Sequence, residues 1–151
     1  MPIEFPEYHT HSGTDMPNIQ FRDIQDSEII ITHSIQGTAV ANSNMFGNAF
    51  IAPSRCRLDS VGESHRVAAS AGTLQLEKLT PGTNKGSGTN LLATTIDLTI
   101  TANQVQKRSG TTLVTNISSR NLAENDRLGL ITTGSLANLQ DVVIVIKLLK
   151  N

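Results

Sequence analysis

The clearest pattern in this 151-residue chain is the alternation of apolar and polar residues from about residue 48 onward. Apolar residues at every second position predict strands over 73–79, 96–100, 113–117 and 127–131. The stretch 142–149 is apolar at almost every position, which predicts a central strand covered on both faces. Short segments rich in Gly, Pro and Ser separate these stretches. No part of the sequence has the periodicity of an amphipathic helix longer than two helical turns. The pattern predicts an all-β fold, a jelly-roll-like antiparallel β-sandwich with an extended N-terminal arm.

The strand with the most regular alternation is the one predicted over 96–100. Ile96, Leu98 and Ile100 alternate there with Asp97 and Thr99. Because successive side chains of a strand point to opposite faces, the three apolar residues are expected to be buried. The two polar residues are expected to be exposed.

The N-terminal part of the chain has no such pattern. Three of the five prolines of the whole chain lie in the first seventeen residues, where they remove backbone donors and favour an extended chain. We interpret residues 1–32 as an extended attachment arm and residues 33–151 as the β-sandwich domain. The proline-rich part of the arm reaches about residue 27, and Ile29–Ile31 is a short strand or an anchor at its end.

Composition narrows the class of partner. Twelve Lys and Arg against thirteen Asp and Glu give a net charge of −1, so electrostatics offer no reason to expect nucleic acid or a membrane as partner. The acidic, proline-broken N-terminus does not resemble a secretory signal, and no apolar run is long enough to cross a bilayer. Aromatic residues are 3% with no Trp, which disfavours a surface that stacks sugars or bases.

Asp59, Ser64 and His65 are the residue types of a hydrolytic triad. However, the chain has no Gly-x-Ser-x-Gly sequence, the sharp turn that exposes the nucleophile in many hydrolases. Any chain of this composition supplies such a trio by chance. We therefore expect no catalytic residues and no enzymatic activity. A hydrolase remains the least favoured alternative.

Two other features have a chemical and a structural interpretation. The glycine-rich stretch 82–89 lacks the Gly-Lys-Ser/Thr ending of a phosphate-binding loop and precedes a β-like run, so a hairpin loop is the preferred interpretation. Cys56 lies between Arg55 and Arg57, which would lower its thiol pKa if they shared its face. However, neighbouring residues of a strand point to opposite faces, so both arginines point away from the face of Cys56. Cys56 is therefore interpreted as a small buried residue and not as a reactive thiol.

The strongest candidate for a metal site is His9-Thr10-His11. Residues at i and i+2 of an extended chain point the same way, so both imidazoles can approach one centre. Three copies around a symmetry axis would supply six nitrogens, a set suited to a transition-metal ion. The alternative is that His9 and His11 are polar arm residues that bind no metal. No other cofactor is expected.

The arm sequence from His9 to Ile19, HTHSGTDMPNI, resembles a segment that recurs in virion proteins of tailed bacteriophages. There a His-x-His-x-Gly-x-Asp-x-Pro run precedes a fibre, spike or appendage domain. The remainder from about residue 48 to 151 also resembles a small phage structural domain. The matching stretches are 52–53, 67–79, 86–92, 102–105 and 124–130.

The resemblance implies a non-enzymatic structural protein of the virion, made in the host cytoplasm, as a capsid decoration protein, head fibre or tail appendage. It further implies a homo-oligomer, with a trimer as the expected state, that the arm anchors to other virion proteins. The alternative is a receptor- or carbohydrate-binding module of a tail fibre, in which loops at one end of the sandwich contact the host surface.

Overall fold

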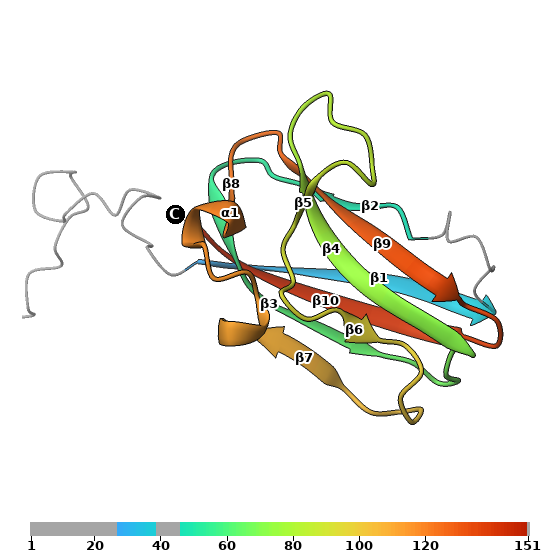
Figure 1. The fold of residues 1–151 in the computed structure, drawn as a ribbon. Helices are drawn as coiled ribbons and strands as arrows, with labels where there is room; N and C mark the ends of the chain where they lie inside the picture. Colours follow the sequence, from blue (N-terminus) through green and yellow to red (C-terminus); the bar gives the residue numbers. More distant parts are fainter. Residues whose placement is uncertain (1–26, 39–45, 151) are drawn as a thin grey trace, which may run out of the picture.

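The structure is a computed structural model that describes residues 27–38 and 46–150. Within them the chain forms two antiparallel sheets of five strands each (Figure 1). The first sheet contains β1 (Glu28–Thr38), β10 (Gln140–Lys150), β3 (Cys56–Ser64), β7 (Gln106–Ser109) and β8 (Asn121–Leu122). The second contains β2 (Asn48–Ile51), β9 (Arg127–Ser135), β4 (Ala71–Leu79), β5 (Thr89–Asn90) and β6 (Ile96–Asp97). A short 3₁₀ helix (Gly110–Thr112) and α1 (Ile117–Arg120) lie between β7 and β8.

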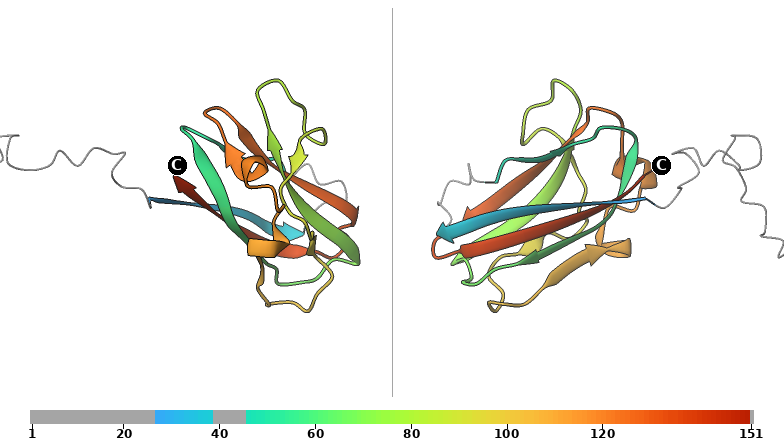
Figure 2. Two further views of the ribbon diagram at one scale, coloured as in Figure 1. Left: turned by 60° about the vertical axis from the view of Figure 1, so that its left-hand side comes forward. Right: turned by 180° about the vertical axis from the view of Figure 1, so that it is seen from behind.

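The order of the strands is that of a jelly roll. The first sheet runs β1-β10-β3-β7, and the second runs β2-β9-β4-β5, so that β1 to β4 lie in the first and second sheets in turn, and β9 and β10 lie in opposite sheets. The first described strand, β1, pairs with the last, β10. Figure 2 shows the two layers from further directions, with β1 and β10 side by side in one of them. The predicted all-β sandwich is therefore confirmed.

The space between the sheets is filled by aliphatic side chains from the inward-facing positions of the long strands. These residues include Leu58, Leu74, Leu76, Leu128, Leu130, Ile144, Ile146 and Leu148, each 1% exposed or less. Burial of one such side chain stabilises the fold by about 1.5–3 kcal/mol. The strands predicted over 73–79 and 127–131 correspond to β4 and β9, whose alternation places these leucines in the core.

The strand predicted over 96–100 is largely wrong. Only Ile96 and Asp97 form β6, and the chain then turns. The Asp97 carboxylate accepts hydrogen bonds from the Thr99 backbone N–H (2.8 Å) and from the Thr99 hydroxyl (2.7 Å). An aspartate that binds the backbone two residues ahead stabilises a turn against a strand. The predicted burial is correct for Ile96 and Leu98, whereas Ile100 is half-buried.

The strand predicted over 113–117 is wrong for a similar reason. Leu113 forms only an isolated bridge with Leu92, and α1 begins at Ile117. The Asn116 side chain caps this helix, because its Oδ1 accepts a hydrogen bond from the Ser118 backbone N–H at 3.0 Å. Asparagine is among the preferred residues at this position. The cap therefore overrides the apolar alternation.

The stretch 142–149 does form a central strand, but the described residues cover only one of its faces. Val142, Ile144 and Ile146 point into the core, whereas Val143 and Val145 are 40% and 39% exposed. The expectation of a strand buried on both faces is therefore wrong for the part of the chain that the structure describes.

Residues 28–32, assigned to the arm from sequence, form the first half of β1. Ile29 and Ile31 pack against the core, and the strand pairs with β10 along its length. The boundary between arm and domain that we placed after residue 32 therefore falls inside β1. The arm residues 1–26 lie outside the described residues.

Candidate functional site

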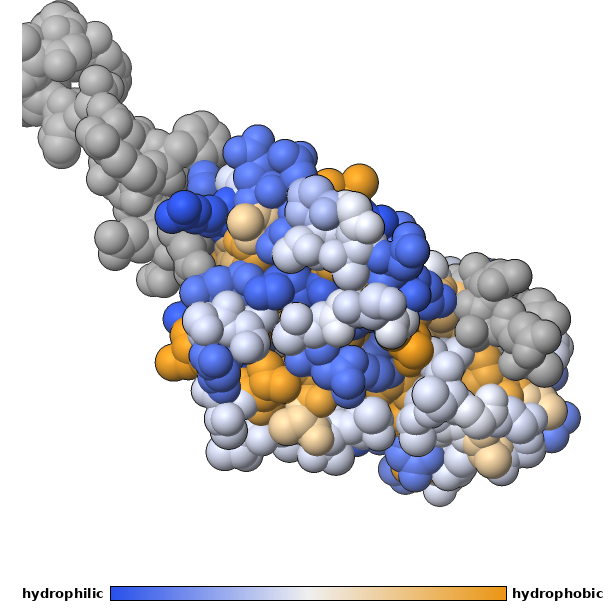
Figure 3. Space-filling model, turned by 45° about the horizontal axis from the view of Figure 1, so that its top comes forward, coloured by the Kyte–Doolittle hydropathy of each residue, from blue (hydrophilic) through white to orange (hydrophobic). Residues whose placement is uncertain are grey.

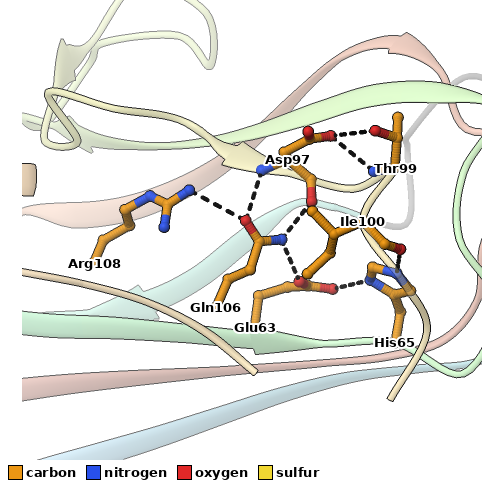
Figure 4. Close-up of polar contacts among 7 residues, drawn as sticks. All are labelled: Glu63, His65, Asp97, Thr99, Ile100, Gln106 and Arg108. Atoms are coloured by element: carbon orange, nitrogen blue, oxygen red, sulfur yellow. Dashed lines mark hydrogen bonds and ion pairs between the residues drawn. The ribbon is translucent and has the colours of Figure 1, made fainter. Parts of the chain in front are cut away.

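The most connected cluster of polar side chains lies where the loop after β6 reaches the first sheet. It consists of Glu63, His65, Asp97, Gln106 and Arg108, which we call the Glu63 network (Figure 4). Glu63 belongs to β3, His65 directly follows that strand, and Gln106 and Arg108 belong to β7. Asp97 comes from β6 of the other sheet, so the network joins the two layers of the sandwich.

Glu63 and His65 form its buried centre, with 1% and 2% of their surface exposed. His65 Nδ1 lies 2.8 Å from Glu63 Oε1, and His65 Nε2 lies 3.1 Å from the carbonyl oxygen of Ile100. A carbonyl oxygen only accepts, so Nε2 carries a proton. The proton between Nδ1 and Glu63 then belongs either to an imidazolium or to a protonated carboxyl. In both states the pair as a whole is neutral, which lowers the cost of burying it.

Gln106 connects this pair to the opposite sheet. Its Nε2 donates to Glu63 Oε2 at 3.3 Å and also to the carbonyl of Asp97, while its Oε1 accepts from the Asp97 backbone N–H at 3.2 Å. Arg108 Nη2 donates to Gln106 Oε1 at 3.2 Å and to the carbonyl of Thr95 at 2.8 Å. The network therefore fastens the segment after β5 to the end of β3.

The titration of the network follows from its position. Burial raises the pKa of the Glu63 carboxyl above its ordinary value, and the hydrogen bond and charge of His65 offset part of this rise. Hydrogen bonds from the Thr99 side chain and backbone lower the pKa of Asp97. Both ring nitrogens of His65 are engaged by groups of the fold itself. The arrangement stabilises the sandwich and leaves no ring nitrogen of His65 for proton transfer to a substrate.

The structure does not assemble the triad considered from sequence. His65 binds Glu63 and the Ile100 carbonyl, and neither bond involves Ser64 or Asp59. Asp59 instead lies 3.8 Å from the Lys147 ammonium group. Glu63 is the acidic partner that sequence reasoning missed. The available signal was Glu-x-His at i and i+2, a spacing that places two side chains on one face of a strand.

Beside the network lies an open, threonine-rich groove of about 600 Å³. Asp97 and Arg108 line it together with five threonines, Thr73, Thr94, Thr95, Thr99 and Thr133. The hydroxyl oxygens of Thr73 and Thr133 lie 2.6 Å apart across β4 and β9. The groove therefore offers hydroxyl groups and one carboxylate, but no aromatic side chain lines it.

The glycine-rich stretch is the loop between β4 and β5, as preferred from sequence. Its backbone N–H groups do bind an anion, and that anion is the Glu77 carboxylate. Glu77 Oε1 accepts from Gly86 N–H at 2.8 Å, and Oε2 accepts from Gly88 N–H at 3.0 Å. Glu77 is only 1% exposed. These two N–H groups are therefore already occupied by a group of the fold.

Cys56 is fully buried in the core, and burial raises the pKa of its thiol. A thiol whose pKa is raised has little thiolate character at neutral pH. The interpretation of Cys56 as a small buried residue therefore agrees with the structure.

The metal ligands proposed from sequence, His9 and His11, lie outside the described residues. Within residues 27–38 and 46–150, no group of three or more His, Cys, Asp and Glu side chains is arranged to hold a metal ion. In the same residues, no helix has the length and apolar character needed to span a membrane.

No protein-family model matches the chain, and no curated protein matches its sequence. One solved structure, the capsid of Ralstonia phage GP4, contains a chain of similar fold. The TM-score is 0.53 at 12% sequence identity, and the similarity covers 85% of this chain and 88% of the phage chain. At this identity the similarity shows that the two chains share a fold.

Proposed function

We propose that the protein is a non-enzymatic structural protein of a phage virion. The observation that carries this proposal is the shared fold over 85% of the chain with a component of a phage capsid. The jelly-roll order of the strands and the engagement of His65 within the fold support it. The resemblance of residues 9–19 and 48–151 to phage virion proteins points the same way.

In its finer form, the proposal is a homotrimer that decorates the capsid, a head fibre or a tail appendage. Residues 1–26 anchor it to another virion protein. β1 begins one residue after this segment and is the edge strand of the first sheet, so an anchored arm would pull on that edge, next to the central strand β10. Assembly around a threefold axis would also bring three copies of His9 and His11 together.

Cryo-electron microscopy of the virion tests the location and the copy number directly. We expect density for the sandwich around a threefold axis, with residues 1–26 in contact with a capsid or tail protein. Deletion of residues 1–26 is expected to preserve cooperative unfolding of the purified domain and to abolish incorporation into particles. Absence of the protein from purified virions would contradict the proposal.

The metal hypothesis has a separate test. Elemental analysis of the purified oligomer is expected to find one transition-metal ion per three chains, which the double substitution His9→Ala/His11→Ala removes. Binding should weaken below about pH 6.5, because histidine must be neutral to coordinate a metal. Metal content below one ion per three chains, unchanged in the double variant, would contradict this hypothesis and leave the role of the arm in attachment.

The second candidate function is a receptor- or carbohydrate-binding module. The threonine-rich groove favours it, because hydroxyls and the Asp97 carboxylate can bind sugar hydroxyl groups. Glycan-array binding by the full chain, reduced at least tenfold in the Asp97→Asn variant, would support this function. Loss of binding in that variant should occur without a change in oligomeric state. Equal binding by both proteins would exclude this groove as the sugar site.

A further inference from the structure

Charge is unevenly divided between the two parts of the chain. Residues 1–26 contain five carboxylates and one arginine, a net charge of −4. The described residues contain eleven Lys and Arg against eight Asp and Glu, a net charge of +3. The near-neutral total therefore hides an acidic segment joined to a basic domain.

The basic residues also gather at one end of the sandwich. β3 and β9 begin there, and β4, β8 and β10 end there, as the strand registers Lys150↔Cys56, Cys56↔Leu122 and Leu79↔Arg127 show. Seven of the eleven cationic residues lie at this end, which we call the cationic end: Arg55, Arg57, Lys78, Lys85, Arg120, Arg127 and Lys150. In Figure 3 this end is on the left, where hydrophilic residues cover much of the upper surface.

The cationic end contains a pocket of about 350 Å³, lined in part by Arg55, Lys78 and Asp126. The Lys78 ammonium group donates to the Asn121 carbonyl at 3.1 Å. The Arg55 guanidinium makes no hydrogen bond or ion pair with any other residue in the part of the chain that the structure describes. Arg55 is also exposed, so its charge is available to a further partner.

Few carboxylates at this end compete for these cations. Asp126 is 4% exposed, and its Oδ2 accepts a hydrogen bond from the Ala123 backbone N–H at 2.8 Å. Glu28 is paired with Lys147. Glu124 is the remaining exposed carboxylate near the pocket. The surface therefore has a surplus of positive charge that fits an acidic polypeptide.

The acidic segment joins the domain at this same end. The Lys150 backbone N–H donates to the carbonyl of Ser27 at 3.1 Å, which fixes the point where residues 1–26 begin. β10 separates β1 from β3, so two strand spacings, about 10 Å, lie between Ser27 and the start of β3. Three to four extended residues span that distance.

We propose that the cationic end is a docking surface for the acidic residues 1–26 of the same chain. Charge complementarity favours the contact, and the short connection gives the segment an effective concentration in the millimolar range. The contact does not depend on the proposed virion role. If that role is correct, a partner in the particle must compete with the domain for the segment.

Carbodiimide coupling on the full chain tests the contact, because it joins carboxylates to lysines that touch. Asp15 and Glu7 are the informative carboxylates, since Asp26 is held nearby by the chain itself. We expect products that join Asp15 or Glu7 to Lys78 or Lys85, identified by mass spectrometry. Their yield should fall several-fold between about 0.05 and 0.5 M salt, because salt screens exposed charges. Refolding ¹⁴N and ¹⁵N chains together separates coupling within a chain from coupling between chains.

The matched variants are Arg55→Glu at the cationic end and Lys107→Glu on β7. Both residues are exposed, so circular dichroism should show the native fold in each variant. We expect Arg55→Glu to reduce the coupling several-fold and Lys107→Glu to leave it unchanged. Equal coupling to Lys107 and to Lys78 would overturn the proposal. Mixed ¹⁴N–¹⁵N products at the share that random pairing of equal amounts of the two chains gives, about half, would also overturn it, because the occupant would then be another copy.

Discussion

Glu63 and Glu77 are both about 1% exposed, yet their carboxylates are stabilised in different ways. Glu77 accepts hydrogen bonds from the backbone N–H groups of Gly86 and Gly88, which cannot titrate. Glu63 bonds to His65, a side chain that can gain or lose a proton. One buried carboxylate is therefore held by fixed dipoles and the other by a partner with which it shares a proton.

The difference shows what each arrangement demands of the fold. Backbone donors hold Glu77 only while the loop keeps its shape. Gly88 must then lack a Cβ, since a Cβ there would lie 2.8 Å from Glu77 Oε2 and 2.5 Å from the Lys78 carbonyl oxygen. The Glu63 network instead depends on side chains from β3 and β7, on His65 directly after β3 and on the backbone of Asp97 in β6. The first arrangement is local, whereas the second joins distant parts of the chain.

The largest effect is expected for His65→Ala. This substitution leaves Glu63 buried without its main partner, and breaking a buried pair in this way costs about 3–5 kcal/mol. Urea unfolding should show a lower free energy of unfolding with little change in slope. A loss below about 1 kcal/mol would mean that the pair contributes little to the stability of the sandwich.

The matched control is Glu63→Gln. An amide at position 63 can donate to His65 Nδ1 and accept from Gln106, while His65 Nε2 still donates to Ile100. Every hydrogen bond between residues 63, 65 and 106 is then retained without a shared proton. We therefore expect the free energy of unfolding to change by less than about 1 kcal/mol. A loss as large as that of His65→Ala would show that charge, rather than hydrogen bonding, holds the network.

An intermediate effect is expected for Glu77→Ala. It leaves the N–H groups of Gly86 and Gly88 without their acceptor, at a cost of about 1–3 kcal/mol. Amide hydrogen exchange should become faster at these two glycines. Exchange at Ser87 should change less, because its N–H donates to the Asn84 carbonyl. Unchanged exchange at both glycines would contradict the role given to Glu77.

The smallest effect is expected from pH. Because the pKa of Glu63 is raised in the folded state, the folded protein binds this proton more tightly than the unfolded chain. The resulting stabilisation is fully present below the ordinary pKa of a glutamate and is lost as the pH rises through the raised value. The free energy of unfolding should be measured from acidic to neutral pH for the wild type and for Glu63→Gln. We expect the wild type to show this loss and the variant, which has no carboxyl at position 63, to lack it.

The imidazole offsets part of the raised pKa of Glu63, which gives a second test. In His65→Gln the charge of the imidazole, which lowers this pKa, is gone, although the amide can still donate a hydrogen bond to the carboxylate. We therefore expect NMR titration of the Glu63 carboxyl to give a still higher pKa in that variant. A lower pKa would contradict the assignment of His65 as the stabilising partner of the carboxylate.

The sequence predicted the long strands better than the short ones. β4 and β9 could be predicted because their core leucines recur at every second position over nine residues. The segments around Asp97 and Asn116 show the same alternation, but one polar side chain in each binds the local backbone and ends the strand pattern. The partners of Glu63 lie up to 43 residues away, a separation that periodicity cannot reveal. The exposure of Val143 and Val145 depends on what covers the sheet, which the strand's own sequence does not encode.

The pairing of β1 with β10 has a consequence for the order of events during synthesis. Paired residues of these strands are more than 100 positions apart in sequence, which is typical of slowly folding topologies. Of the described strands, β1 is made first and its partner β10 is made after all the others. Until residue 150 has been made, the first sheet lacks its central strand and apolar residues such as Ile29 and Ile31 have no partner. Chains interrupted before that point cannot complete the domain, so translation to β10 selects which copies can enter an assembly.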